Sequence, residues 1–554
     1  MKKQTLFLIA LMFIMNGAPT FADTIFIDPT YMGEIYNGTV TTPYKSWESV
    51  SFTNGNSYLQ KRGTTYTSST QILINLKNNI KIGAYGEGDK ARFSYTGTER
   101  AFRLMSSSYC TIENFEVDGN GNSLALIGVN GTEGSYTLKN TIKNCLIYNA
   151  NNASNGGYGI HGFYNDSLAI INTEIHKIGL DGIYLANEPN VEIGYCYIHD
   201  VNRIYFINPD QTQSSGDGIQ LDGYYNGFHI HNTIIDRTGG AGNKFNLILA
   251  SKPGTSDNAK GIIEYCTFKT GSNVATAFYI GMGNGIITRY NIFEGVAPAI
   301  RLSGMYTSNN LIHNNLFYNC ESGIGVAYTY PAETGGPCTG TKIYNNVFYH
   351  VPKNHIWIDK TDIETSNNIH VRTNDSGVAI YNYGGGTWKI SNNCYSSKEV
   401  AGTPGTGANS IIGDPLFVDP ENQNFNLQEN SPCINAGFDV NIPFDMDGVK
   451  IPFGTHPDIG AYEFMPASGA ILIGRDKLKI YPNPSIGIFN IHTDMTGESE
   501  IAFEVRNLSS HLVHKGFFQT AESVINLTSL PPGIYFLSID LQNNKLITKK
   551  IIKT

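Results

Sequence analysis

The sequence is poor in charge and has no long apolar run beyond its first residues. Only 15% of its 554 residues are charged, and 47 acidic residues against 38 basic ones give a net charge of −9. Because the only basic cluster lies at the extreme C-terminus, we do not expect nucleic acid as a partner. No later segment is apolar over a length that crosses a bilayer, so we expect no transmembrane span.

Cysteine is also scarce, and common catalytic motifs are missing. Eight cysteines in 554 residues are too few for a disulfide framework and lack metal-type spacing. One disulfide, between Cys320 and Cys338, remains an option in a secreted chain. The sequence contains no G-x-S-x-G, zinc motif, P-loop or dinucleotide fingerprint. Enzymes built on these motifs are therefore not expected.

The N-terminus has the pattern of a secretory signal. Lys2 and Lys3 precede a short apolar run over residues 6–15, which is too short to span a bilayer. The tripeptide at 20–22, Thr-Phe-Ala, fits a cleavage site before Asp23. We therefore predict that residues 1–22 are a signal peptide and that the protein is secreted.

The chain is rich in glycine (59) and tyrosine (33), and from about residue 101 it repeats. A Gly-Ile-x-Leu pattern alternates with one in which a small or polar residue precedes Ile, Val or Phe. That small residue forms one column: Cys145, Thr173, Cys196, Thr233, Cys266, Asn291, Asn315 and Asn346. Its shortest spacings, 23 to 25 residues, fit the coils of a right-handed parallel β-helix, which bury their apolar sides by stacking. We predict this all-β fold.

Period-2 alternation predicts an outward stripe along the helix. In each Gly-Ile-x-Leu strand the Ile and Leu point inward, so the residue between them points out. The stripe runs through His161, Tyr184, Gln220, Ile248, Tyr279, Arg301, Gly325 and Trp357. Rings and polar tips along a groove suit a sugar chain. We therefore predict that substrate contacts come from Tyr184, Gln220, Tyr279 and Trp357, although a solvated sheet face would also tolerate these residues.

Three carboxylates lie beside this stripe. Asp181 and Asp217 each precede a Gly-Ile, so they should stack one coil apart, roughly 4.8 Å. Asp222 ends the same strand as Asp217. Stacked carboxylates repel unless a cation or a shared proton lies between them. We predict that these three residues bind Ca²⁺ through their oxygens, with turn-forming aspartate as the alternative.

Lys244 opens the coil that follows Asp217. A lysine whose pKa is lowered by burial and positive neighbours can act as a base. We predict that Lys244 takes this role, with His161 and Arg301 as further catalytic residues. Arg237 and Arg301 are candidate clamps for a substrate carboxylate. Such a set suits β-elimination on a uronic acid, in which a base removes the C5 proton and the 4-linked sugar leaves.

The repeat sets the domain boundaries. Residues 23–100 read as an N-terminal cap with a short helix at Trp47 and Val50, and 101–400 as the catalytic β-helix. Residues 401–468 read as a closing segment, and 475–554 as a separate small β-sandwich.

The last segment resembles a known sorting domain. It begins with YPNP at 481–484, continues with LPPGIYFLSI at 530–539 and ends in the lysine-rich 545–554. These features resemble the C-terminal sorting domain of the type IX secretion system of Bacteroidetes. The resemblance implies the type IX machinery as a partner, passage across the outer membrane, and release or attachment at the cell surface.

The β-helix resembles secreted polysaccharide lyases. The acidic rung followed by a lysine in GNKF at 242–245 is loosely similar to polysaccharide lyase family 9, and the Lys and Arg pair to family 6. GDGIQLD at 216–222 stands where family 9 has D-D-G-x-D. The resemblance implies a lyase, acting as a monomer on an acidic polysaccharide. A glycoside hydrolase of the same fold and a non-catalytic glycan-binding protein are the alternatives, because the fold alone does not decide among them.

Overall fold

The structure is a computed structural model. It describes the following residues: 23–151, 156–201, 216–237, 246–250, 260–270, 276–281, 283–303, 307–327, 338–372, 377–397, 405–465, 478–481, 487–493, 501–507, 512–518, 522–528, 530, 533–541 and 545–553. The predicted signal peptide and Lys244 lie outside these residues.

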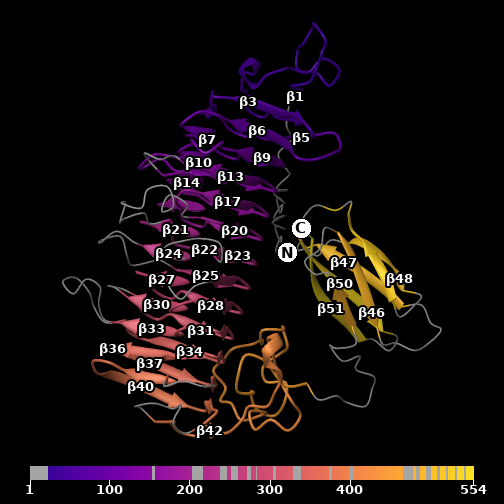
Figure 1. Cartoon of the computed structure of the whole chain (residues 1–554). Helices are drawn as coiled ribbons and strands as arrows, with labels where there is room; N and C mark the ends of the chain where they lie inside the picture. The colour runs from indigo at the N-terminus through magenta and orange to yellow at the C-terminus, as the bar shows by residue number, and fades with distance from the viewer. Residues whose placement is uncertain are drawn as a thin grey trace, which may run out of the picture.

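Three long parallel sheets form the body of the molecule (Figure 1). One runs from β1 (Thr24–Ile27) to β40 (Gly386–Ser391), and another from β3 (Thr65–Ser68) to β42 (Ile411–Ile412). The third, which we call the site sheet, runs through β4 (Ile72–Asn75), β7 (Arg100–Met105), β10 (Ala125–Asn130), β14 (Tyr158–Phe163), β18 (Ile183–Ala186), β21 (Ile219–Asp222), β24 (Leu247–Ala250), β27 (Phe278–Ile280), β30 (Ile300–Ser303), β33 (Ile324–Ala327), β36 (Ile356–Asp359) and β39 (Ile380–Asn382). Each strand pairs with its equivalents in the next coils, so the predicted parallel β-helix is confirmed.

Each coil turns from the β1–β40 sheet into the β3–β42 sheet through a buried ladder. The residue before the ladder position is left-handed, as at Asn314 (φ 50°) and Asn345 (φ 53°). Asparagine tolerates this region better than most residues. From Asn291 onward, each ladder side chain accepts a hydrogen bond from the backbone N–H of the ladder residue one coil earlier. The ladder continues beyond the predicted column to Asn368 and Asn393.

The ladder cysteines are small buried residues, as their alignment with Thr and Asn indicates. All eight cysteines are buried and free. The thiols of Cys320 and Cys338 donate to the carbonyls of Phe293 and Ala327, so the disulfide considered between them is not formed in the structure.

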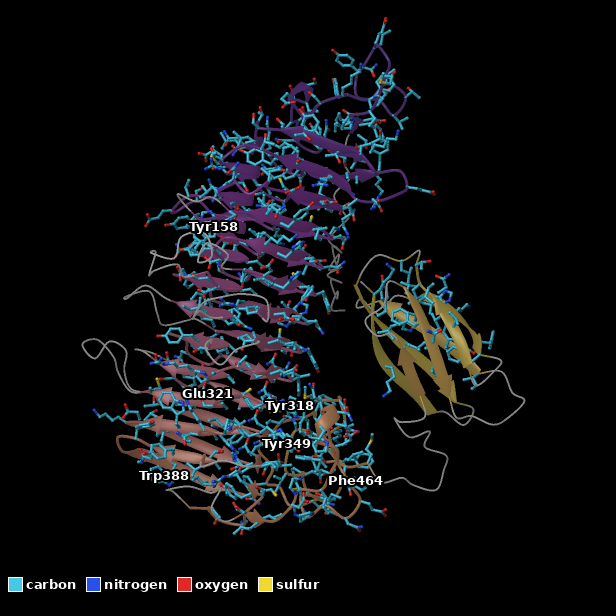
Figure 2. All side chains as sticks on the ribbon, in the orientation of Figure 1. Tyr158, Tyr318, Glu321, Tyr349, Trp388 and Phe464 are labelled. Carbon is cyan, nitrogen blue, oxygen red and sulfur yellow. The ribbon has the colours of Figure 1, made fainter. Side chains whose placement is uncertain are left out.

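The two ends of the helix are closed by different means. At the N-terminal end the expected helix is one 3₁₀ turn, η1 (Trp47–Ser49), and the buried Trp47 donates to Gln60 Oε1 at 2.8 Å. Near the other end the closing segment contains one antiparallel hairpin, β43 (Phe417–Asp419) with β44 (Asn424–Leu427). There the Tyr349 hydroxyl donates to Glu421 Oε1 at 2.8 Å, and Figure 2 labels Tyr349 beside this segment.

The C-terminal segment has its own core. One sheet contains β45 (Leu478–Tyr481), β46 (Ile488–Thr493) and β49 (Glu522–Asn526). The second contains β47 (Ile501–Asn507), β48 (Leu512–Phe518), β50 (Gly533–Leu541) and β51 (Lys545–Lys553). Phe489, Val505 and Leu537 belong to one buried cluster, which makes the segment a small β-sandwich, as predicted. In the part of the chain that the structure describes, no helix has the length and apolar character that a membrane crossing requires.

Candidate functional site

The site sheet carries the predicted stripe in register. Its pairing places in one column the residues Leu73, Arg103, Gly128, His161, Tyr184, Gln220, Ile248, Tyr279, Arg301, Gly325, Trp357 and Tyr381. The flanking positions are buried, as Ile183 and Leu185 on either side of Tyr184 show. The column therefore lies on the outer face, as the alternation predicts.

A glycine in this column lets an arginine reach a histidine. A Cβ added to Gly128 would lie 2.4 Å from Cδ and 2.9 Å from Nε of Arg100, so the arginine side chain crosses the space that a larger residue would fill. Beyond Gly128, the guanidinium of Arg100 lies 3.1 Å from Nδ1 of His161. The absence of a side chain at position 128 is thus part of the site.

Arg100 and its neighbour Arg103 form an unusual pair. The two guanidinium groups are close enough that Arg103, after burial, helps to lower the pKa of Arg100. Among the described residues neither arginine has an acidic partner within 4.0 Å, and the buried Nε of each has no hydrogen-bond partner. Two adjacent cations with unused donors are costly unless an anion accepts their hydrogen bonds. The pair therefore has the character of a carboxylate-binding site.

His161 is a neutral hydrogen-bond donor in this setting. Burial, with the charges of Arg100 and Arg103, lowers its pKa to about 3. An arginine can only donate, so Nδ1 accepts its hydrogen bond and the proton of the neutral ring is assigned to Nε2. His161 is therefore poorly suited to act as a base but can donate Nε2–H to a ligand.

Two tyrosines and a carboxylate adjoin His161. The rings of Tyr158 and Tyr184 lie 4.6 Å and 5.5 Å from the imidazole; Tyr158 is labelled in Figure 2. The Tyr184 hydroxyl donates to Asp222 Oδ2 at 2.8 Å, and Gln220 donates to the same oxygen at 3.0 Å. Burial raises the pKa of Tyr158 to about 12 and, with the Asp222 charge, raises the pKa of Tyr184 further. Both hydroxyls are protonated at neutral pH and can donate a proton.

Asp181 and Asp217 align as predicted but are buried at the strand entry, 4% and 2% exposed. The backbone N–H of Asp217 donates to Asp181 Oδ1 at 2.5 Å. Burial and the Asp217 charge raise the pKa of Asp181 well above its usual value, while Arg237 opposes this rise. Asp181 therefore holds its proton to a higher pH than an ordinary carboxyl.

The described residues do not assemble the expected calcium ligands. Asp222 belongs to the far end of β21 and its Oδ2 already accepts two hydrogen bonds. Across the described ranges, no group of three or more His, Cys, Asp or Glu side chains is placed to hold a metal ion. Asp181, Asp217 and Asp222 therefore do not fit a calcium site by themselves, and calcium binding stays a prediction.

The other predicted residues lie far along the same column. Tyr279 is three rungs from Tyr184, or about 14 Å at the usual strand spacing. Arg301 is five rungs from His161, or about 24 Å. Trp357 is two rungs further on. Arg301 and His161 are thus not brought to one bond of a substrate, whereas Tyr184 and Gln220 are brought to His161.

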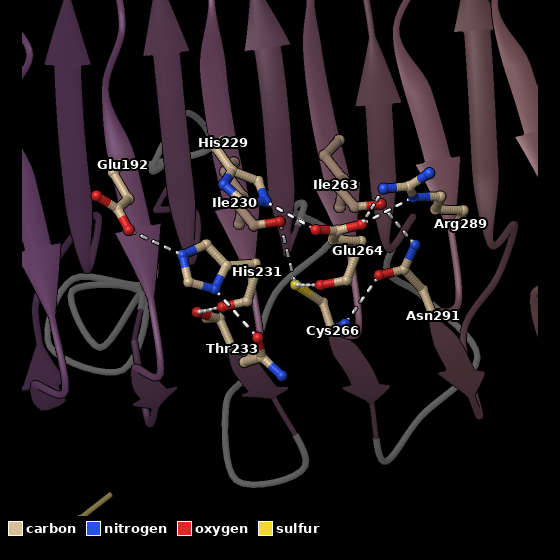
Figure 3. A network of polar contacts seen from close by, with 11 residues as sticks. Glu192, His229, Ile230, His231, Thr233, Ile263, Glu264, Cys266, Arg289 and Asn291 are labelled. Atoms are coloured by element: carbon tan, nitrogen blue, oxygen red, sulfur yellow. Dashed lines mark hydrogen bonds and ion pairs between the residues drawn. The ribbon is translucent and has the colours of Figure 1, made fainter. Parts of the chain in front are cut away.

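A second polar network lies on a different face. His229 and His231 belong to β22 (Phe228–His231) of the β1–β40 sheet. Figure 3 shows His231 beside Glu192, and Glu264 between His229 and Arg289. Nε2 of His231 lies 3.2 Å from Oε1 of Glu192. These polar side chains contact one another and are separate from the site sheet.

The repeat pattern did not identify Arg100, Arg103 or Tyr158. A signal for Arg103 exists, because AFRLM at 101–105 fits the apolar-x-apolar pattern two coils before His161, the first residue of the predicted stripe. No pattern signals Arg100 or Tyr158. Both sit at the entry to their strands, where the alternation does not state which way a side chain turns.

Two family models match parts of this chain. Residues 100–247 match the family described as the right handed beta helix region, and 479–554 match the secretion system C-terminal sorting domain. The A-module of mannuronan C-5 epimerase AlgE4 from Azotobacter vinelandii is 13% identical, with 60% of this chain and 90% of that chain covered and a TM-score of 0.44. A mannuronic acid specific polysaccharide family 6 lyase from human gut microbiota is 14% identical (67% and 80% covered, TM-score 0.41).

A third solved structure comes from another class of enzyme. The GH136 lacto-N-biosidase from Eubacterium ramulus is 11% identical, with 67% and 68% covered and a TM-score of 0.36. Similarities at this level do not bear on reaction or substrate. No curated protein matches the chain. The chain is a right-handed β-helix protein that ends in a secretion-system sorting domain, and this domain indicates secretion and attachment at the cell surface.

Proposed function

We propose that this protein is a secreted enzyme that cleaves an acidic, uronate-containing polysaccharide by β-elimination. The observation that carries the proposal is the pair Arg100 and Arg103, whose charges act on each other and which have no acidic side chain within 4.0 Å among the described residues. Charge-assisted hydrogen bonds from such a pair are suited to a uronate carboxylate. Neutralising that carboxylate acidifies the C5 proton next to it.

The remaining groups divide the proton transfers. His161 orients the sugar through Nε2–H, because its Nδ1 already accepts from Arg100. The base that removes the C5 proton is proposed to be Lys244, which opens the coil after the Asp217 strand in sequence. As the C4–O bond breaks and the C4=C5 double bond forms, the leaving oxygen needs a proton, which the hydroxyl of Tyr158 or Tyr184 can supply.

A glycoside hydrolase is the second candidate, favoured by Asp181. A buried carboxyl whose pKa is raised well above its usual value resembles the general acid of a hydrolase. The two reactions leave different products. Elimination creates an unsaturated, ultraviolet-absorbing end, whereas hydrolysis creates only a reducing end.

The test is a substrate screen with both readouts. The full chain is incubated with pectate, alginate, chondroitin and carrageenan, and absorbance and reducing ends are followed together. Absorbance rising in step with reducing ends supports the lyase, and reducing ends alone support the hydrolase. If no polysaccharide is cleaved but one is bound, the protein is a non-catalytic glycan binder.

Variants then test the site. Arg103→Gln should lower kcat/KM about 10- to 100-fold, the effect of losing one charged hydrogen bond of about 1.5–3 kcal/mol. Lys342→Gln, an exposed cation on the β1–β40 sheet, is the matched control and should keep full activity. Lys244→Ala should abolish the absorbance. Equal activity of Arg103→Gln and wild type would remove the basis of the proposal.

A further inference from the structure

The outer face of the site sheet carries a group of aromatic rings far from the arginine pair. Trp357 belongs to the outward column in β36, and Tyr381 follows it in β39. The ring of Tyr383 lies 4.7 Å from that of Tyr381 and 6.1 Å from that of Trp357. Tyr381 and Tyr383 are 36% and 66% exposed. We call Trp357, Tyr381 and Tyr383 the aromatic platform.

A glycine sets the position of the indole. A Cβ added to Gly325 would lie 2.2 Å from Cζ2 and 2.6 Å from Nε1 of Trp357. The indole therefore lies across the rung at Gly325 rather than standing away from the sheet, and it extends toward the rung of Arg301. This repeats the arrangement at Gly128, where Arg100 crosses an empty position of the same column.

Charge accompanies the rings. Arg301 occupies the rung before Gly325, and its buried Nε has no hydrogen-bond partner. No acidic side chain lies within 4.0 Å of its charged nitrogens among the described residues. A flat ring that covers a glycine, two exposed phenols and an arginine without an acidic neighbour together suit the apolar face of a pyranose and its carboxylate.

We propose that the aromatic platform with Arg301 is a distal subsite that binds the same acidic polysaccharide chain as the arginine pair. This inference rests on the proposed function for its ligand. The column connects the two places: Trp357 is seven rungs from His161, or about 34 Å at the usual strand spacing. One rung is comparable with the length of one pyranose, so a chain lying along the column reaches the platform only when it is about seven or more sugars long.

The consequence is a dependence on chain length. Long chains gain binding free energy at the platform that short oligosaccharides cannot gain, so the enzyme should cleave polymers more efficiently than short fragments. Ground-state contacts remote from the reacting bond chiefly change KM. Loss of the platform should therefore raise KM for polymers and leave the kinetics on short oligosaccharides unchanged.

The experiment compares Trp357→Ala and Tyr383→Ala with Tyr197→Ala in the full chain. Tyr197 is 39% exposed and belongs to β20 (Tyr197–His199) in the β3–β42 sheet, so it is a control for losing a surface ring. Binding to the polysaccharide found in the screen is measured by affinity electrophoresis. KM is measured on the polymer and on tetrasaccharides. Tyr383→Ala guards against misfolding of the tryptophan variant, since its ring is largely exposed.

We expect Trp357→Ala to weaken polymer binding about tenfold, equal to about 1.4 kcal/mol, with tetrasaccharide kinetics unchanged and Tyr197→Ala like wild type. If both platform variants bind and cleave the polymer like wild type while the enzyme is active, the subsite is refuted and the proposed function stands. If no substrate is cleaved but polymer binding still depends on Trp357, the subsite stands and the proposed function fails.

Discussion

The asparagine ladder predicts a large and position-specific loss of stability in Asn346→Ala. Asn346 Oδ1 accepts both the backbone N–H and the side-chain amide of Asn315, each at 3.0 Å. Its own amide donates to the carbonyls of Ile312 and Tyr344 and to Asn368 Oδ1. All these groups belong to one buried column.

The magnitude follows from what the truncation leaves behind. The backbone N–H of Asn315 loses its acceptor inside the protein, which costs about 1–3 kcal/mol, and about two further hydrogen bonds are lost at about 0.5–1.5 kcal/mol each. We expect Asn346→Ala to destabilise its coil by about 2–6 kcal/mol.

Cys196→Ala is the matched control in the same column. The Cys196 thiol donates weakly to the carbonyls of Ile170 and Gly194, and its sulfur accepts the backbone N–H of Thr173, a weaker contact than one to an amide oxygen. The backbone N–H of Cys196 keeps its acceptor, Thr233 Oγ1. The loss of this thiol should therefore cost about 1–2 kcal/mol, less than the loss of the Asn346 amide.

The assay must be local, because a stack of coils need not unfold in one step. Hydrogen exchange of the strands on either side of the ladder, β32 (Leu316–Tyr318) and β35 (Val347–Tyr349), reports the opening free energy of these coils. A truncation at Asn346 that costs no more than the one at Cys196 would refute the view that the ladder amides hold the turn.

Three further predictions test other parts of the molecule. Gly128→Val should displace Arg100 and so raise the pKa of His161 from about 3, which an NMR titration measures. The control Gly413→Ala, whose added Cβ meets nothing within 4 Å, should leave this pKa unchanged. An unchanged His161 pKa in Gly128→Val would contradict the contact between Arg100 and His161. His370 is fully buried beside His355, and burial holds its pKa well below 6.5. Below pH 6.5 the unfolded chain therefore binds a proton that the folded chain does not, so the free energy of unfolding falls as pH falls. In denaturant titrations, His370→Phe should reduce this dependence by about 1.4 kcal/mol per pH unit. The same pH dependence in His370→Phe and wild type would refute the prediction. Finally, the calcium prediction expects activity to fall in a chelator and to return with Ca²⁺; activity that the chelator leaves unchanged would refute it.

Much of the fold could be read from the sequence because one period governs it. A coil must repeat its inward Ile and Leu and its small ladder residue to stack on the next coil, so the column from Cys145 to Asn346 recurs in the chain itself. The same register predicted the outward stripe, which the strand pairing confirms from His161 to Trp357. The sorting domain was likewise read from its local motifs.

The site was decided by tertiary structure. Period and alternation state that His161, Tyr184 and Arg301 share a face, and the order of the stripe already separates Arg301 from His161 by five rungs. They do not show that Arg100, from the entry of a strand two coils earlier, crosses Gly128 to reach the imidazole. The sequence by itself therefore determined the scaffold and the face, because stacking repeats along the chain. Only the folded structure determined which side chains converge, because that depends on which neighbouring rung leaves room for them.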